Sequence, residues 1–150
     1  MSIAGHRVTP FLWYDGQAEE AARFYVAVFK KGSRVTSTSP MSVTFELEGQ
    51  PFIALNGGPQ YRFTEAVSFQ IPCADQTEVD RLWTALSDGG SEGRCGWLKD
   101  RWGVSWQVVP VRLQQLLGDP DPGRSRRAMQ AMLTMKKIVI ADLDRAAEGH

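Results

Sequence analysis

The chain has 150 residues, of which 43% are hydrophobic and 23% charged, a composition typical of a folded protein and not of a disordered one. Seventeen basic residues balance seventeen acidic ones, so no excess positive charge favours binding to nucleic acid or to an anionic membrane. No apolar run approaches the roughly 18 residues that span a bilayer, and residues 1–16 lack a signal-peptide pattern. We expect a single cytoplasmic domain over residues 1–150 with neither nucleic acid nor membrane as a partner.

Side chains that support common catalytic sites are scarce. The two histidines, His6 and His150, lie near the termini, where chains are usually poorly ordered, so hydrolase sites built on a well-held histidine are disfavoured. Cys73 and Cys95 lack metal-type spacing and are expected to be reduced thiols, with one disulfide bridge as the open alternative. No P-loop and no glycine-rich dinucleotide motif is present. The sequence alone therefore does not name a reaction or a substrate.

The first half of the chain predicts a strand, a helix and then further strands. Residues 7–14 are rich in aromatic and branched side chains and end at a turn, as a strand does. Apolar residues over 17–30 recur at spacings of three and four, which predicts an amphipathic helix. Strands are predicted at 41–48, where apolar and polar residues alternate, and at 52–56, with a weaker candidate at 34–37.

The second half repeats this order. Residues 66–73 alternate like a strand, and Asp75 with Glu78 three residues later forms the capping box of a second helix. Strands are predicted at 94–99 and 104–109, joined by a short turn. The two halves share an arrangement and not a sequence, which indicates an internal duplication.

Each half is therefore a βαβββ module, and the predicted fold class is α+β. The first module spans residues 7–59, the second spans 65–110, and a helical tail covers 111–150. The arginines at positions 124, 126 and 127 lie at the start of a tail helix, where they oppose its dipole. They are either solvated or paired with Asp119, Asp121 or a neighbouring subunit.

The tail also contains a series of apolar residues that is too large to stay exposed to solvent. The series either packs on its own chain or is buried between two subunits. Together with the open sheet edges of the modules, it predicts a homodimer. The apolar residues in question are Met129, Met132, Leu133, Met135, Ile138 and Ile140.

Four stretches carry a resemblance to a known family: LWYDGQAEEAARFY (12–25), ALNGGP (54–59), CGWLKDRWGVSWQ (95–107) and AMLTMKK (131–137). They resemble the PhnB-like branch of the vicinal oxygen chelate superfamily, often labelled 3-demethylubiquinone-9 3-methyltransferase. The superfamily also includes glyoxalase I, extradiol dioxygenases and bleomycin-resistance proteins. The resemblance covers nearly the whole chain and implies two paired βαβββ modules. One departure is the link 31–40, which looks shorter than in similar proteins, as if a loop were missing.

The resemblance also implies where a metal would be held. Superfamily enzymes use His and Glu side chains on the first and last strands of each module. None of the corresponding positions is His, Asp or Glu, and the amide oxygens of Asn56 and Gln107 alone would hold a hard cation weakly. We therefore expect no metal and no cofactor. These positions are Val8 or Pro10, Ala54 or Asn56, Ala66, and Gln107.

Strand alternation predicts which side chains leave the helix-covered face of each sheet. Ser68 and Gln70 alternate with apolar residues in the strand 66–73, and so do Ser105 and Gln107 in the strand 104–109. These polar residues are expected on the open face, where a curled sheet can enclose a ligand. Amides there can equally bond to one another or to water.

The remaining strands are harder to orient. In 52–56 we assign Ile53 and Leu55 to the helix, which leaves Phe52 and Asn56 on the open face. In 94–99 neither face is clearly favoured, and we take Trp97 as a pocket wall. The predicted ligand-binding residues are Phe52, Asn56, Ser68, Gln70, Trp97, Ser105 and Gln107.

This neutral, polar and aromatic lining favours a protein that binds a small, flat or hydroxylated molecule without catalysing a reaction. The alternatives are an enzyme, suggested only by the superfamily, and a protein-interaction module that acts through the tail. Lys99 and Asp100 are expected to form a surface pair at a turn.

Overall fold

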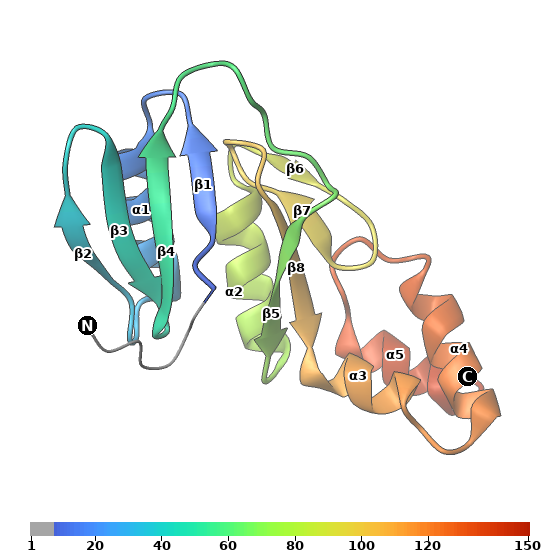
Figure 1. Cartoon of the computed structure of the whole chain (residues 1–150). Coiled ribbons are helices and arrows are strands. Elements are labelled where there is room, and N and C mark those ends of the chain that lie inside the picture. Colours follow the sequence, from blue (N-terminus) through green and yellow to red (C-terminus); the bar gives the residue numbers. More distant parts are fainter. Residues whose placement is uncertain (1–7) are drawn as a thin grey trace. The chain divides into compact units, whose positions relative to one another are not determined.

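The computed structural model describes residues 8–150 and divides the chain into two compact units, one ending at Phe63 and the other beginning at Thr64. Each unit has a four-stranded sheet and a covering helix, and three further helices follow the second sheet (Figure 1). His6 and the start of the predicted first strand lie outside the described residues. Within residues 8–150, no helix is long and apolar enough to cross a membrane.

The first unit has the predicted βαβββ order. Its elements are β1 (Phe11–Tyr14), α1 (Ala18–Phe29), β2 (Arg34–Thr38), β3 (Ser42–Leu47) and β4 (Gln50–Asn56). The strands lie in the order β1-β4-β3-β2, with β1 parallel to β4 and the other pairs antiparallel. The weak strand candidate at 34–37 is thereby confirmed as β2, an exposed edge strand.

Aromatic rings fill the core between α1 and its sheet. Tyr25 stacks on Phe45 at a centroid distance of 6.1 Å, and Phe45 stacks on Phe52 at 5.4 Å. Phe52 is therefore buried, and its predicted place on the open face is wrong. The reason is register, because Phe52 lies directly opposite Phe45 and shares its face. Ile53, assigned to the helix, lies on the other face and is only half-buried.

The second unit repeats the order of the first. It contains β5 (Ser68–Cys73), α2 (Gln76–Ser87), β6 (Ser91–Glu92), β7 (Trp97–Lys99) and β8 (Ser105–Pro110). The strand order is β5-β8-β7-β6, so the two sheets have the same topology. The predicted strand 94–99 is shorter in the structure, because residues 94–97 form a turn.

Local signals explain how α2 begins and which face it buries. The Asp75 side chain accepts a hydrogen bond of 2.9 Å from the Glu78 amide, as the predicted cap requires. The apolar stripe of α2 then packs on the sheet and covers one face of β5 and β8. Its buried residues are Val79, Leu82, Trp83 and Leu86.

The tail forms α3 (Val111–Leu117), α4 (Pro122–Met132) and α5 (Ile140–Ala147). These helices bury one apolar cluster against Val109 at the end of β8. The tail therefore packs on its own chain, which was one of the two alternatives. The cluster also contains Leu113, Leu116, Ala128, Ile138, Leu143 and Ala147.

The tail arginines have structural partners. Arg124 pairs with Asp119 at 3.0 Å and also with Glu148. The pKa of the Asp119 carboxyl lies below its usual value mainly because it accepts a hydrogen bond from the Asp121 amide, and secondly because of Arg124. The pKa of the Glu148 carboxyl is lowered mainly by the Arg124 guanidinium. Arg127 donates to the Ala147 carbonyl at the end of α5, which suits the negative end of a helix dipole. These contacts tie α4 to α5.

Both cysteines are free thiols in the structure, as expected. Cys73 is fully buried under α2, and desolvation raises the pKa of its thiol to about 12. Its thiolate is therefore negligible at neutral pH, and Cys73 acts as a small apolar core residue.

Candidate functional site

The open face of the second sheet gathers the polar residues that alternation predicted. In β5, Ile71 and Cys73 are buried, whereas Gln70 is exposed and Ser68 half-exposed. Gln70 lies opposite Gln107 in β8, and Gln107 lies opposite Trp97 in β7, so these three side chains form one row across the sheet.

A second row runs beside the first. Ser68 lies opposite Ser105, and Ser105 lies opposite Lys99. The Gln107 side-chain amide donates to the Ser68 hydroxyl at 2.9 Å and connects the two rows. The structure thus brings together on one face five of the predicted residues: Ser68, Gln70, Trp97, Ser105 and Gln107. Part of the hydrogen-bonding capacity of Gln107 and Ser68 is used in the bond between them.

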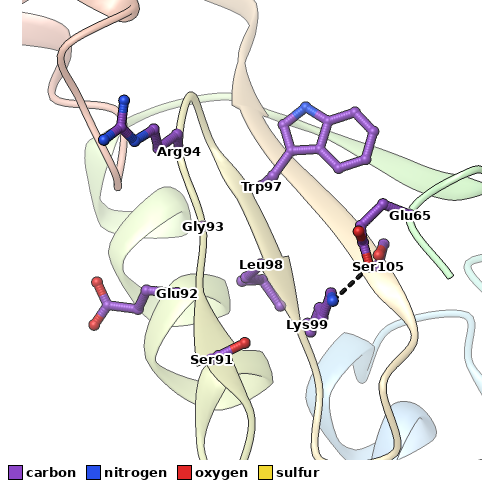
Figure 2. A pocket seen from close by; sticks show the side chains of 9 residues that line it. All are labelled: Glu65, Ser91, Glu92, Gly93, Arg94, Trp97, Leu98, Lys99 and Ser105. Carbon is purple, nitrogen blue, oxygen red and sulfur yellow. Dashed lines mark ion pairs between the residues drawn. The ribbon is translucent and has the colours of Figure 1, made fainter. Parts of the chain in front are cut away.

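A cavity of about 410 Å³ opens beside these rows, toward the edge formed by β6 and β7. Its volume suits a small organic molecule. Figure 2 shows the Trp97 indole, Lys99, Ser105 and Glu65 around it, with Arg94 at the turn that precedes β7. The lining residues are Glu65, Ser91, Glu92, Gly93, Arg94, Trp97, Leu98, Lys99 and Ser105.

Ser105 is the most unusual residue of this lining. It is 1% exposed, and its hydroxyl oxygen is a buried side-chain polar atom without a hydrogen-bond partner within residues 8–150. Buried polar groups are nearly always paired, and leaving one unpaired costs about 1–3 kcal/mol. Ser105 also lines the cavity.

Charges in the lining balance one another. Lys99 forms an ion pair with Glu65, and this contact is the main reason why the pKa of the Glu65 carboxyl lies below its usual value. Arg94 and Glu92 supply a second basic and a second acidic group. The cavity therefore has no excess charge, which favours a neutral or zwitterionic occupant.

The turn between β7 and β8 holds Lys99 and Ser105 in place. Asp100, expected at the surface, is 2% exposed, so that expectation is wrong. Its carboxylate accepts hydrogen bonds from the amides of Trp102 and Val104 at 2.9 and 3.0 Å, and from the Trp106 indole at 2.9 Å. The chain reversal needs these acceptors, so Asp100 turns inward. Lys99 pairs with Glu65 instead.

Asn56 does not lie on the open face of its own sheet in the first unit. Its side-chain oxygen accepts a 2.9 Å hydrogen bond from the Ala18 amide at the start of α1, and its side-chain nitrogen donates to the Pro40 carbonyl. Its predicted place on the open face is wrong, because it holds the first turn of α1, where backbone amides lack helical partners.

The four charged residues of the cavity lining are absent from the predicted set: Glu65, Glu92, Arg94 and Lys99. Lys99 lies two residues after Trp97 and shares its face, so alternation could have found it. Glu65 lies in the link before β5 and has no periodic signal. Its ion pair with Lys99 is visible only in the folded structure.

Two of the positions at which superfamily enzymes hold a metal can be described directly. The Asn56 oxygen is already used by the Ala18 amide, and Ala54 has no ligating group. Among residues 8–150, no group of three or more His, Cys, Asp or Glu side chains is placed to hold an ion. We therefore derive no step through a metal.

Comparison with known proteins agrees with this architecture. Two βαβββ units with mixed four-stranded sheets define a protein of the vicinal oxygen chelate fold. The chain belongs to the family described as 3-demethylubiquinone-9 3-methyltransferase, whose model matches residues 6–109. The predicted family and fold are thus confirmed. Comparison with curated proteins found no match.

Solved structures support the same assignment. The PhnB protein of Bacillus cereus is 29% identical, with a TM-score of 0.64 over 70% of this chain and 99% of its own. Protein PA1353 of Pseudomonas aeruginosa is 21% identical, with a TM-score of 0.59 over 71% and 98%. A glyoxalase/bleomycin resistance protein of Albidiferax ferrireducens is 13% identical, with a TM-score of 0.53 over 68% and 95%. The last two show the fold alone.

Proposed function

We propose that the protein is a cytoplasmic small-molecule-binding protein that holds a neutral, flat, hydroxylated or carbonyl-bearing compound on the open face of its second sheet. The observation that carries this proposal is the buried, unpaired Ser105 hydroxyl beside a cavity of about 410 Å³. A polar group of the ligand would complete the hydrogen bonding of that hydroxyl. The free thiols support the cytoplasmic location.

The ligand class follows from the neighbours of Ser105. Trp97 offers an aromatic surface on which a planar ring can pack. Lys99 and Glu65 neutralise one another at the rim, so a charged ligand would have to break their ion pair. Gln70 and Gln107 extend the polar row beyond the cavity and suit additional hydroxyl or carbonyl groups.

Binding explains the site better than catalysis does. The polar groups around Ser105 and the cavity are hydroxyls, amides and charged side chains, and none is a histidine that could move a proton near neutral pH. Methyl transfer, which the family description suggests, is not part of the proposal. The two strand-to-helix turns, at 15–17 and 74–75, contain a single glycine, and neither resembles a phosphate-binding loop for a nucleotide-type methyl donor.

Substituting Ser105 tests this proposal through two opposite effects. We expect Ser105→Ala to raise the free energy of unfolding of the free protein by about 1 kcal/mol, because it deletes an unpaired buried hydroxyl. The same change should raise the Kd of the bound compound about tenfold, equivalent to about 1.4 kcal/mol. Urea unfolding measures the first effect, and titration of tryptophan fluorescence with hydroxylated aromatic compounds measures the second.

Two variants complete the test. Trp97→Phe should remove most of the fluorescence change on binding, whereas Thr77→Ala, on the exposed side of α2, should alter neither affinity nor signal. If no compound of the panel gives a saturable change with the unmodified protein, the proposed function is wrong. If Ser105→Ala loses stability, the hydroxyl has a structural partner and the central observation fails.

We further propose that the protein is a homodimer that buries the open face of the first sheet against a second copy. Phe11 is 63% exposed, and it lies in a row with Ile53, beside the row of Trp13 and Leu55. An apolar face of this kind on an open sheet favours self-association. The tail supports this choice indirectly, because its apolar cluster is already covered by its own unit.

Light scattering tests the dimer. We expect a mass twice that of the 16.7 kDa chain at micromolar concentration, and a monomer for Phe11→Glu. Met129→Glu changes an exposed tail residue in the same way and should leave the dimer intact. A monomeric unmodified protein would contradict the proposal. Dissociation by Met129→Glu and not by Phe11→Glu would instead place the interface on the tail.

A further inference from the structure

The helical tail lies outside the part of the chain that the family model matches, which ends at residue 109. It contains a segment, residues 135–140, that leads from the turn after α4 to the first residue of α5 and that we call the strap. Ile138 of the strap is fully buried in the tail cluster. The strap runs back to the turn that precedes β7, and Arg94 and Trp97 of that turn line the cavity.

The turn at 94–97 has an unfavourable backbone conformation for a residue other than glycine. Cys95 and Gly96 both have positive φ, at 59° and 84°, and the Trp97 amide donates to the Arg94 carbonyl at 3.0 Å. Positive φ at both central residues defines a type I′ turn, which usually contains Asn or Gly. Cys95 adopts this conformation against its preference, so the turn needs support from elsewhere.

The strap supplies that support through the backbone. The Cys95 amide donates to the Met135 carbonyl at 2.8 Å, and the Gly96 amide donates to the Lys136 carbonyl at 2.8 Å. The side chain of Ile138 packs over Gly96, where an added Cβ would lie 3.2 Å from it. Both amides of the strained turn are therefore satisfied by the tail.

A single side chain of α2 fastens the strap. The Gln76 amide nitrogen donates to the Ile138 carbonyl at 3.0 Å, and its oxygen accepts from the Ile140 amide at 2.8 Å. The same nitrogen bonds Asp80, which also pairs with Lys137 at 2.9 Å. The carboxamide of Gln76 thus supplies both a donor and an acceptor to the strap backbone, which a carboxylate or an ammonium group cannot do.

We infer that the strap, fastened by Gln76, is a positioning element that sets the place of Trp97 in the cavity wall. Trp97 directly follows the supported turn, and its carbonyl accepts from the Gly93 amide at 2.8 Å, so the turn and the first residue of β7 move as one. The binding role of Trp97 rests on the proposed function, whereas the strap's hold on the turn does not. Gln76 acts through the strap and does not line the cavity.

Hydrogen exchange and fluorine NMR test this inference without any ligand. In Gln76→Ala we expect the amides of Cys95 and Gly96 to exchange at least tenfold faster than in the unmodified protein. In protein labelled with 5-fluorotryptophan, the Trp97 resonance, assigned by Trp97→Phe, should shift or broaden, while that of Trp83 in the core of α2 stays in place. Thr84→Ala, at an exposed position of the same helix, is the matched control and should change neither reading.

A folded Gln76→Ala with unchanged exchange at Cys95 and Gly96 and an unchanged Trp97 resonance would overturn the inference. So would equal shifts of all tryptophan resonances, because they would indicate general loosening. If Gln76→Ala does not fold, Gln76→Glu keeps the oxygen that Ile140 needs and loses the donor to Ile138. It must then give a smaller change of the same kind at the turn. If the turn responds as expected but no compound binds, the proposed function alone fails.

Discussion

We expect Asp100→Ala to lower the free energy of unfolding by about 4 kcal/mol. Asp100 is 2% exposed, and its two carboxylate oxygens accept three hydrogen bonds, two from turn amides and one from the Trp106 indole. Hydrogen bonds to a charged group contribute about 1.5–3 kcal/mol each, and an unpaired buried donor costs a further amount, with less than full additivity. Domains of this size are stable by about 5–15 kcal/mol, so the loss is large.

Urea unfolding followed by tryptophan fluorescence measures this loss. Asp88→Ala is the matched control, because the Asp88 side chain is 79% exposed and lies 3.6 Å from Arg101 in a weak surface pair. It should change the free energy of unfolding by less than about 0.5 kcal/mol. A loss below about 1 kcal/mol for Asp100→Ala would contradict the role given to this carboxylate.

The Trp106 contact can be separated from the other two by a double-mutant cycle. In Asp100→Asn, one side-chain atom becomes a donor, and it faces either the turn amides or the indole, which are donors as well. Trp106→Phe removes the indole donor and relieves that conflict. We therefore expect the double variant to be more stable than the sum of the two single losses predicts.

Local patterns were sufficient to predict much of the fold. The alternation in β3 and β5 and the three-and-four spacing in α1 and α2 are properties of single segments, and they place apolar residues on one face. Ser68 and Gln70 were assigned to the open face on this basis, and their burial agrees with it.

Prediction was wrong where consecutive residues in the middle of a strand are all apolar, or where a polar group has a distant partner. Phe52 has apolar neighbours on both sides, so only its pairing with Phe45 decides its face. Asn56 and Asp100 are both turn-type residues in sequence, but their oxygens are taken up by Ala18 and by Trp106. The strap depends on contacts between residues about 40 and 60 positions apart, which no local pattern contains.

The edge of the second sheet also depends on a close contact between the backbone of Gly90 and that of Lys99 and Asp100. In the sequence, only the presence of a glycine at this position indicates it. Gly90 follows α2 and precedes β6, whose Ser91 lies opposite Lys99 of β7. A Cβ at Gly90 would lie 2.0 Å from the Lys99 carbonyl oxygen and 2.6 Å from the Asp100 carbonyl carbon. Both atoms belong to the backbone and cannot swing aside. Gly90 is therefore required for close approach.

We accordingly expect Gly90→Ala to lower the free energy of unfolding by about 3 kcal/mol, because the added methyl group forces β6 away from β7. The same displacement would distort the rim at Ser91 and Glu92, so the affinity of the cavity should fall as well. Urea unfolding measures the loss of stability, and the fluorescence titration described for Ser105→Ala measures the loss of affinity.

Gly118→Ala is the matched control for this change. Gly118 has a φ of −93°, and an added Cβ would lie 3.4 Å from its nearest neighbour, the Gln114 carbonyl oxygen. We expect its effect to stay within about 0.5 kcal/mol, since alanine fits this conformation and restricts the unfolded chain. Equal stabilities for Gly90→Ala and Gly118→Ala would mean that β6 is not held against the Lys99 carbonyl. A loss of stability confined to Gly90→Ala, accompanied by weaker ligand binding, would support both the close contact and the placement of the cavity at this edge.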